Sequence, residues 1–134
     1  MSQRFLLPDG WSRPAGYSHG IATTGTQIFV AGQIGWDADK HIDRENFVAQ
    51  ARQSLLNIVA ILHAGGAKPE HVVRLTWYVL SAEQYRASSV SLGAAYRAVM
   101  GHHYPVMTAV QVVALMEPDA LVEIEATAVI PDGK

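Results

Sequence analysis

The sequence predicts an α+β fold in which two helices pack on one face of a mixed sheet of about six strands. Two observations predict this class. Short apolar runs, punctuated by glycine and proline, alternate with two longer segments whose apolar residues recur at helical spacing. The last apolar run, 121–130, alternates its side chains between two faces, as a strand does. Two helices can cover only one face of such a sheet, so the other face must meet water or another copy of the chain.

The N-terminal part of the chain carries short strand candidates separated by turn residues. The strand candidates are Arg4–Leu7, Tyr17–Ala22 and Gln27–Ala31. Glycine and proline at 9–10, 14–16 and 24–26 mark the turns that separate them.

A helix should follow, because apolar residues between Phe47 and Leu62 recur at the 3.6-residue period. Asp43 is the expected N-cap, and Gly65-Gly66 should end the helix. The next segment, His71–Leu80, is β-branched and aromatic and is therefore a predicted strand. Its alternation puts four apolar side chains on one face: Val73, Leu75, Trp77 and Val79.

The second helix should begin at Ser81, where Ser81 and Gln84 have the spacing of a capping box, and end at Gly101. Its expected buried stripe is Tyr85, Ser89, Leu92, Tyr96 and Val99. Two final strands, Thr108–Leu115 and Leu121–Ile130, are joined by a turn at 116–120. The predicted order is therefore β-β-β-α-β-α-β-β.

Two carboxylates, Glu123 and Glu125, share one face of the last strand. A buried carboxylate without a partner is costly, so this face should meet either water or another subunit. One of the two could position water or move a proton in a reaction. Equally, both could be solvated side chains at the edge of a sheet. The spacing leaves these alternatives open.

Composition bounds the class of protein. A chain of 134 residues predicts one domain, 1–134, and its hydrophobic content of 49% favours self-association. We expect a cytoplasmic protein, because no apolar run is long enough to cross a membrane and the N-terminus does not resemble a signal peptide. The absence of cysteine excludes disulfides, thiolate catalysis and Cys-type zinc sites.

Charge and motifs predict no nucleic-acid, metal or cofactor site. The net charge is −2 and the basic residues are scattered, whereas nucleic-acid binding needs a cationic surface. The segment Gly32–Gly35 lacks the pattern of a phosphate loop, because no helix follows it directly. The pair His102-His103 has no further ligand at a recognisable spacing and is interpreted as a polar loop.

Several stretches together resemble the signature stretches of the RidA/YjgF family. They are Gly16–Ser18, Phe29–Ile34, Gln50–Gln53, Leu55–Ile58, Val72–Thr76 and Val122–Ala126. The resemblance runs from about Gly16 to Val129, in order and with similar spacing. It implies a chorismate-mutase-like fold, a homotrimer, and clefts for small molecules between subunits.

The resemblance also implies a chemistry, the hydrolysis of reactive imines and enamines of 2-oxo acids with release of ammonia. By motif, Tyr17 matches the family's pocket tyrosine, Glu123 its water-positioning glutamate, and Gly32 the glycine whose backbone faces the ligand. Ala109, on the fifth predicted strand, falls in the same implied cleft. No cofactor and no metal is implied.

The chain departs from the family pattern where the substrate carboxylate is bound. Imine deaminases of the family carry an arginine in a Pro-x-Arg-Ser/Thr motif, and Met107 stands at that position here. A thioether cannot form the bidentate pair that an arginine forms with a carboxylate. Other departures are Gly93 for a common asparagine, Ala31 for a serine and His19 for a glutamine.

No other cation is placed in the cleft by the sequence. Alternation puts Arg74 on the face opposite Trp77, and Arg97 lies on the second predicted helix. His103, two residues before Pro105, is the nearest substitute for the missing arginine.

Two functions follow from this pattern. The first is a hydrolase of a small imine, enamine or related metabolite that is not the usual 2-imino acid. The alternative is a non-catalytic trimer that binds a small ligand or a protein partner in the same cleft. A third, ribonuclease activity, is disfavoured by the acidic charge balance.

Overall fold

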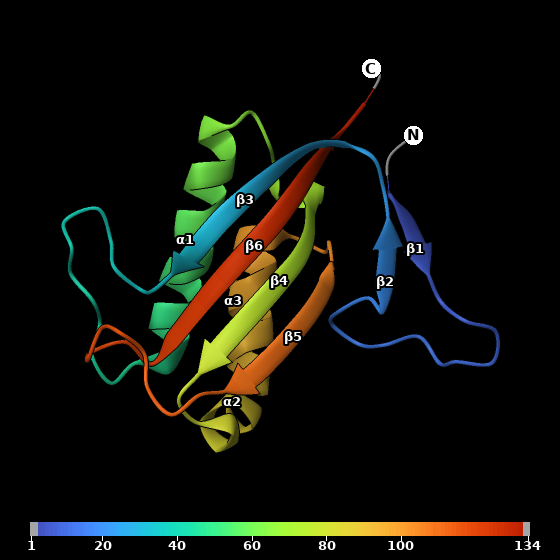
Figure 1. The fold of residues 1–134 in the computed structure, drawn as a ribbon. Coiled ribbons are helices and arrows are strands. Elements are labelled where there is room, and N and C mark those ends of the chain that lie inside the picture. The colour runs from blue at the N-terminus through green and yellow to red at the C-terminus, as the bar shows by residue number, and fades with distance from the viewer. Residues whose placement is uncertain (1–2, 133–134) are drawn as a thin grey trace.

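A computed structural model describes residues 3–132 of the chain (Figure 1). The strands are β1 (Arg4–Leu6), β2 (Gly20–Ala22), β3 (Gly25–Gln33), β4 (Val72–Val79), β5 (Val106–Gln111) and β6 (Val122–Pro131). The helices are α1 (Phe47–Ala64), α2 (Ala82–Ala87) and α3 (Ser89–Met100), with a short 3-10 turn, η1, at Pro69–His71. The α+β class expected from the sequence is confirmed.

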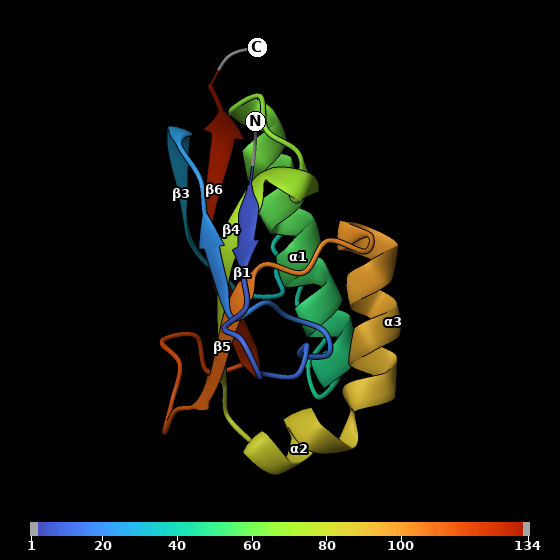
Figure 2. The ribbon, with the colours of Figure 1, turned by 90° about the vertical axis from the view of Figure 1, so that its right-hand side faces the viewer.

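The expected strands divide between two sheets rather than one. The main sheet has the order β3-β6-β4-β5, in which β4 and β5 are parallel and the other neighbours antiparallel. Strands β1 and β2 pair only with each other and form a small sheet beside one end of β5 (Figure 2). A single parallel bridge between Ser18 and Val106 connects the segment before β2 to β5.

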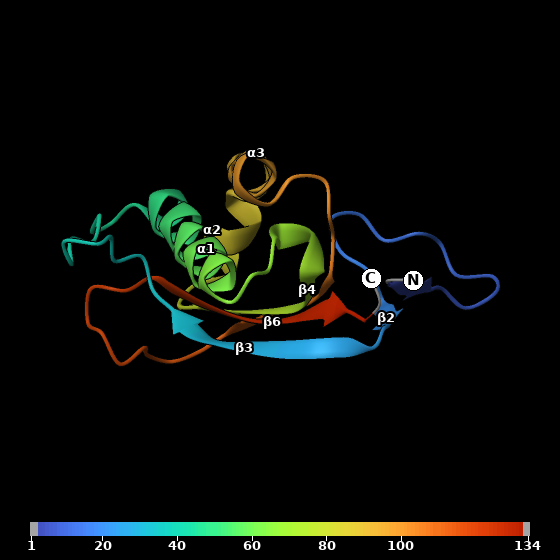
Figure 3. The same ribbon diagram turned by 90° about the horizontal axis from the view of Figure 1, so that it is seen from above.

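All three helices lie on one face of the main sheet and leave the other face open (Figure 3). The core lies between the layers, where the apolar stripe of α1 packs on the inward side chains of β4 and β6. The fully buried members of this core include Leu55, Ile58, Leu62, Leu75, Val122 and Ile124. Burial of such side chains from water is the main stabilising contribution to the fold.

The second predicted helix is interrupted at Ser88, which separates α2 from α3. Ser81 caps α2 as expected, and its hydroxyl accepts a hydrogen bond from the Gln84 N–H at 3.0 Å. Consecutive serines have low helix propensity, because their side chains compete for backbone hydrogen bonds. The break shifts the buried stripe of α3 to Leu92, Tyr96 and Met100, and it leaves Ser89 exposed.

Two local expectations are wrong by a few residues. Asn46, not Asp43, caps α1, because its Oδ1 accepts a hydrogen bond from the Ala49 N–H at 3.0 Å. A register shift near the start of β4 buries Val72 and leaves Val73 half-buried. The rest of β4 alternates as predicted.

The open face of the sheet carries the polar side of β6. Ile124, Ala126 and Ala128 are buried beneath the helices, whereas Glu125 is exposed and Glu123 is half-buried on the other side. Phe29 of β3 lies on that open side with 73% of its surface exposed. Within residues 3–132, no helix is long and apolar enough to cross a bilayer.

Candidate functional site

A pocket of about 490 Å³ lies between the edge strand β5 and the helices α2 and α3. Its volume falls within the range of sites that bind small molecules. The lining residues come from the loop before β2, from β4 and β5, and from α2 and α3. They are Ala15, Gly16, Tyr17, Trp77, Tyr85, Ser89, Leu92, Gly93, Tyr96, Arg97, Tyr104, Met107 and Ala109. Four residues expected in a cleft are thus together here: Tyr17, Gly93, Met107 and Ala109.

The parallel pairing of β4 and β5 determines which side chains of β5 enter the pocket. Met107 pairs with Leu75 and Ala109 with Trp77, and both partners are buried beneath the helices. Because side chains alternate along a strand, Met107 and Ala109 also point toward the helical layer. The neighbouring Thr108 is exposed on the open side.

The loop that carries Tyr17 is tied to the segment before β5. The backbone N–H of Ser18 donates to the Pro105 carbonyl at 3.0 Å, and its hydroxyl donates to the Tyr104 carbonyl at 2.5 Å. These two bonds hold the neighbouring Tyr17 at the rim, where its side chain is partly exposed and lines the pocket.

Arg97 is a pocket residue that the sequence reasoning did not place there. It lies one helical turn after Gly93, and residues four apart share a helix face. Its guanidinium Nη1 lies 3.1 Å from the position that a Cβ on residue 93 would occupy. The i, i+4 spacing from Gly93 was the signal in the sequence that could have identified it. Of the described residues that line the pocket, Arg97 is the charged one.

Two tyrosines of the pocket, Tyr85 and Tyr96, have hydroxyl groups whose pKa is raised above the ordinary value. Burial raises the pKa of the Tyr85 hydroxyl above its ordinary value. Burial, together with the neighbouring Tyr104, does the same for the pKa of Tyr96. The Tyr96 hydroxyl donates to the His103 carbonyl at 2.6 Å, and its ring stacks on Tyr104. The indole N–H of Trp77 is buried and has no acceptor among the described residues.

Glu123 and Gly32 lie together on the opposite face of the sheet. A Cβ built on Gly32 would overlap Oε2 of Glu123, so the absence of a side chain at this position gives the carboxyl group room to lie against the strand. Glu123 pairs in register with Tyr78, and Ala31 is exposed beside Gly32, where the pairing of β3 with β6 shifts. The expected site residues therefore form two groups, and in one chain the sheet separates Glu123 from Tyr17.

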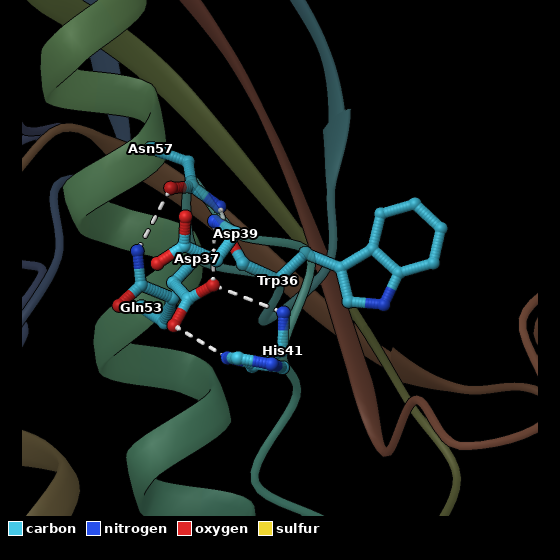
Figure 4. A network of polar contacts seen from close by, with 6 residues as sticks. All are labelled: Trp36, Asp37, Asp39, His41, Gln53 and Asn57. Carbon is cyan, nitrogen blue, oxygen red and sulfur yellow. Dashed lines mark hydrogen bonds and ion pairs between the residues drawn. The ribbon is translucent and has the colours of Figure 1, made fainter.

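Helix α1 positions the loop that follows Gly32. The Asn57 side-chain amide donates to the Ile34 carbonyl at 3.2 Å. It also donates to the Trp36 carbonyl at 2.7 Å (Figure 4). A Cβ on Gly35 would be 2.7 Å from Cα of Gln50, which shows how closely this loop packs on the helix. Gln50 is itself fully buried and hydrogen-bonds Asp43, Asp119 and Leu121.

The same loop contains a cluster of the half-buried Asp37 with the exposed Asp39 and His41 (Figure 4). Their potential ligand atoms lie within 4.8 Å of one another. The Asp37 carboxylate accepts the backbone N–H groups of His41 and Asp39, both at 2.9 Å. The His41 N–H is the main cause that lowers the pKa of Asp37. These bonds form a turn and account for the cluster.

The two histidines considered above lie outside the main pocket. His19 packs edge-on against Tyr17 and Trp11 and lines a smaller hollow with Phe5 and His103. His103 is bonded through Nε2 to the Val72 carbonyl at 2.6 Å. His103, the nearest substitute for the missing arginine in the sequence, thus lies outside the pocket that contains Met107.

Comparison with known proteins identifies relatives over almost the whole chain. The family described as Endoribonuclease L-PSP matches residues 11–130. A 2-iminobutanoate/2-iminopropanoate deaminase from Salmonella typhimurium is 34% identical over 78% of this chain and 80% of its own. A RutC family protein from Pyrococcus horikoshii is 35% identical over 92% of this chain and 94% of its own.

Solved structures of similar proteins have the same fold. A Rid family protein of unknown function from Yersinia pestis has a TM-score of 0.82 and 32% identity, covering 97% of this chain and 100% of that one. The YjgF gene product of Escherichia coli has a TM-score of 0.67 and 30% identity, covering 94% and 98% respectively.

Proposed function

This chain belongs to the RidA/YjgF family, and on that premise we propose that it forms a homotrimer whose inter-subunit clefts hydrolyse a small imine or enamine other than the usual 2-imino acid. One observation carries the proposal. The pocket around Tyr17 and the carboxylate of Glu123 lie on opposite faces of the same sheet. A cleft that contains both therefore needs two copies of the chain.

The open face of the sheet supports this association. It exposes Phe29 beside the polar side of β6, and further large apolar side chains lie exposed in the β5–β6 loop, at Val113 and Met116. Burial of such side chains between copies contributes roughly 25 cal/mol for each Å² of apolar surface removed from water. In the proposed trimer, Glu123 of one copy faces the pocket of its neighbour.

In the proposed reaction, a water molecule attacks the C=N carbon and forms a tetrahedral carbinolamine. The Glu123 carboxylate accepts a hydrogen bond from this water, orients its lone pair, and takes up its proton as the C–O bond forms. Glu123 first returns that proton to the nitrogen, which gives the neutral carbinolamine. It then accepts the carbinolamine hydroxyl proton and passes it to the amino nitrogen, so that the C–N bond breaks, the carbonyl forms and ammonia leaves. The Tyr17 phenol, at the rim of the pocket, donates a hydrogen bond to the water or to the departing nitrogen.

The wall on β5 supports an unusual substrate. Met107 and Ala109 present apolar surface there, so the strand offers no guanidinium to a carboxylate next to the C=N carbon. Charge-assisted hydrogen bonds of that kind contribute about 1.5–3 kcal/mol. Turnover of 2-iminopropanoate should therefore be at least about tenfold slower than in relatives that have the arginine.

The test is ammonia release from a panel of imines generated in place, comparing wild type with Glu123→Gln. We expect this variant to lose about a hundredfold or more in kcat. Glu125→Gln is the matched control, because Glu125 shares the face of Glu123 but bonds to Tyr78. Unchanged turnover in Glu123→Gln would remove this residue from the mechanism.

Met107 also favours the alternative function, a trimer that binds a small ligand without catalysing a reaction. With methionine in place of the arginine, the ion pair that binds a substrate carboxylate is missing. Ligands that raise the Tm without any ammonia release, across the whole panel, would support this second function.

A further inference from the structure

We propose that Arg97 is the anion-binding residue of the pocket, and that the substrate carries a carboxylate remote from its C=N carbon on an apolar or aromatic body. This inference rests on the proposed function of the same pocket and specifies its substrate class. In relatives that have the arginine, the cation of the site is on β5, at the position of Met107. In this proposal the cation is on α3, at Arg97.

The first support is the charge of the pocket. Arg97 lines it, and its guanidinium has no ion pair with any carboxylate in the described part of the chain. By contrast, Arg44 pairs with Asp119 at 3.1 Å. A guanidinium presents several N–H donors in a planar fork, which matches the two oxygens of a carboxylate.

The second support is the space in which this guanidinium lies. Glycine weakens the middle of a helix, yet Gly93 lies within α3. A side chain at residue 93 would begin 3.1 Å from Nη1 of Arg97, closer than a relaxed contact. The absence of a side chain at Gly93 therefore lets Arg97 lie along the helix surface at the pocket wall. The chain departs from the family pattern at both Gly93 and Met107. In this proposal the two departures belong together, because the cation of the pocket is then on α3 and no longer on β5.

The remaining wall specifies the body of the ligand. Leu92, Met107 and Ala109 supply apolar surface, and Trp77 and Tyr85 supply an aromatic corner in which their rings meet edge to face. Trp77 is 3% exposed, and its buried N–H lacks an acceptor among the described residues. Because this N–H is closed off from the pocket space, the corner offers a ligand aromatic surface rather than a hydrogen-bond donor.

The position of the cation determines the position of the carboxylate. The guanidinium is on α3 and the vacated position is on β5, so the two lie on different walls. In the proposed trimer, the carbon that is attacked stays beside the carboxylate of Glu123. An α-carboxylate would then lie against Met107, whereas a carboxylate further along an apolar chain or ring can reach Arg97.

The experiment compares two probes of the same shape, phenylacetate and its neutral amide, phenylacetamide, by calorimetry on the assembled protein. We expect wild type to bind phenylacetate about tenfold more tightly, with the difference shrinking as salt is added. Arg97→Gln should abolish this preference and keep the affinity for phenylacetamide, which also reports that the pocket is folded. Arg86→Gln, an exposed arginine of α2 outside the pocket, should keep the preference.

A second variant tests the role of the glycine. Gly93→Asn should lower phenylacetate affinity several-fold by displacing the guanidinium, with little effect on the amide. An unchanged preference in Arg97→Gln would overturn the proposal, as would a wild type that binds phenylacetate no better than the amide.

The outcomes separate this inference from the proposed function. If Arg97→Gln loses the carboxylate preference but no imine is hydrolysed, the anion site stands and the hydrolase fails. If imines are hydrolysed with Glu123 required, but Arg97→Gln keeps the preference, the hydrolase stands and the anion site fails.

Discussion

The Tyr78 hydroxyl donates a 2.5 Å hydrogen bond to Oε1 of Glu125, from β4 to β6, on the sheet face that the helices leave open. The bond to Glu125 is the main cause that raises the pKa of Tyr78, followed by desolvation and the negative charges of Glu125 and Glu123. The hydroxyl is thus held protonated by the acidic side of the sheet.

Replacing this carboxylate should lower the pKa of Tyr78. We expect Glu125→Gln to shift the pKa of Tyr78 back toward its ordinary value of about 10. Ultraviolet titration of the tyrosines, with Tyr78→Phe to assign the transition, measures the shift. Because the folded-state pKa is raised, the stabilising contribution is complete below the unfolded-state pKa and is lost as pH rises through the folded-state pKa. An unshifted transition in Glu125→Gln would contradict the assigned cause.

A guanidinium on β5 should restore activity toward the 2-imino acids that arginine-bearing relatives hydrolyse. Met107 lines the pocket, so Met107→Arg places a cation on the wall from which it is missing. We expect the variant to gain about ten- to a hundredfold in kcat/KM for 2-iminopropanoate, as measured by ammonia release. Met107→Gln, of similar length without charge, is the control. Wild-type activity equal to that of arginine-bearing relatives would show that Met107 does not have the effect inferred here.

Two nearby glycines, Gly32 at the end of β3 and Gly35 in the loop after it, should respond differently to alanine. At Gly32 the new Cβ meets the end of a flexible side chain, the Glu123 carboxyl, whereas at Gly35 it meets the backbone of Gln50. We expect Gly32→Ala to reduce imine hydrolysis strongly, with a small change in the free energy of unfolding. Gly35→Ala should lower that free energy by about 1–3 kcal/mol, the usual cost of overpacking. Chemical denaturation and ammonia release, measured on both variants, decide this, and equal loss of stability in the two would be the contrary result.

Association through the open face should depend on Phe29. We expect light scattering to report a trimer for wild type and a shift toward monomer for Phe29→Glu, since a charge buried between copies is costly. Val90→Glu is the control, because Val90 is 85% exposed on α3, away from that face. A stable wild-type monomer would remove the basis of the shared cleft.

Periodicity predicted the elements well and their tertiary arrangement less well. The alternation of β6 and the stripe of α1 determined which side chains are buried, because both patterns record contact with a single core. The pairing of β1 with β2, away from the main sheet, depends on contacts between distant segments that no local pattern encodes. The break at Ser88 and the cap at Asn46 differ from the expectation by local hydrogen bonds of polar residues.

The candidate site residues came from motifs, and the open-face position of Glu123 came from the alternation of the last strand. The register of β4 with β5 adds what the sequence did not give, because it places Met107 on the other face, beneath the helices and beside Tyr17. The sequence did not place Arg97 in the cleft, because the position of one residue on a helix does not show which strands lie opposite its side chain. Its spacing from Gly93 acquires meaning once both residues line the same pocket.

The placement of Tyr17 and Glu123 on opposite sides of one sheet has a consequence for mixtures of inactive proteins. In the proposed assembly, Tyr17→Phe and Glu123→Gln each damage every cleft when present alone. Unfolding and refolding the two together would scramble the subunits, and about one cleft in four would then combine an intact phenol with an intact acid from its neighbour. Two inactive variants would thus regain part of the activity when mixed, which corresponds to intragenic complementation in a cell.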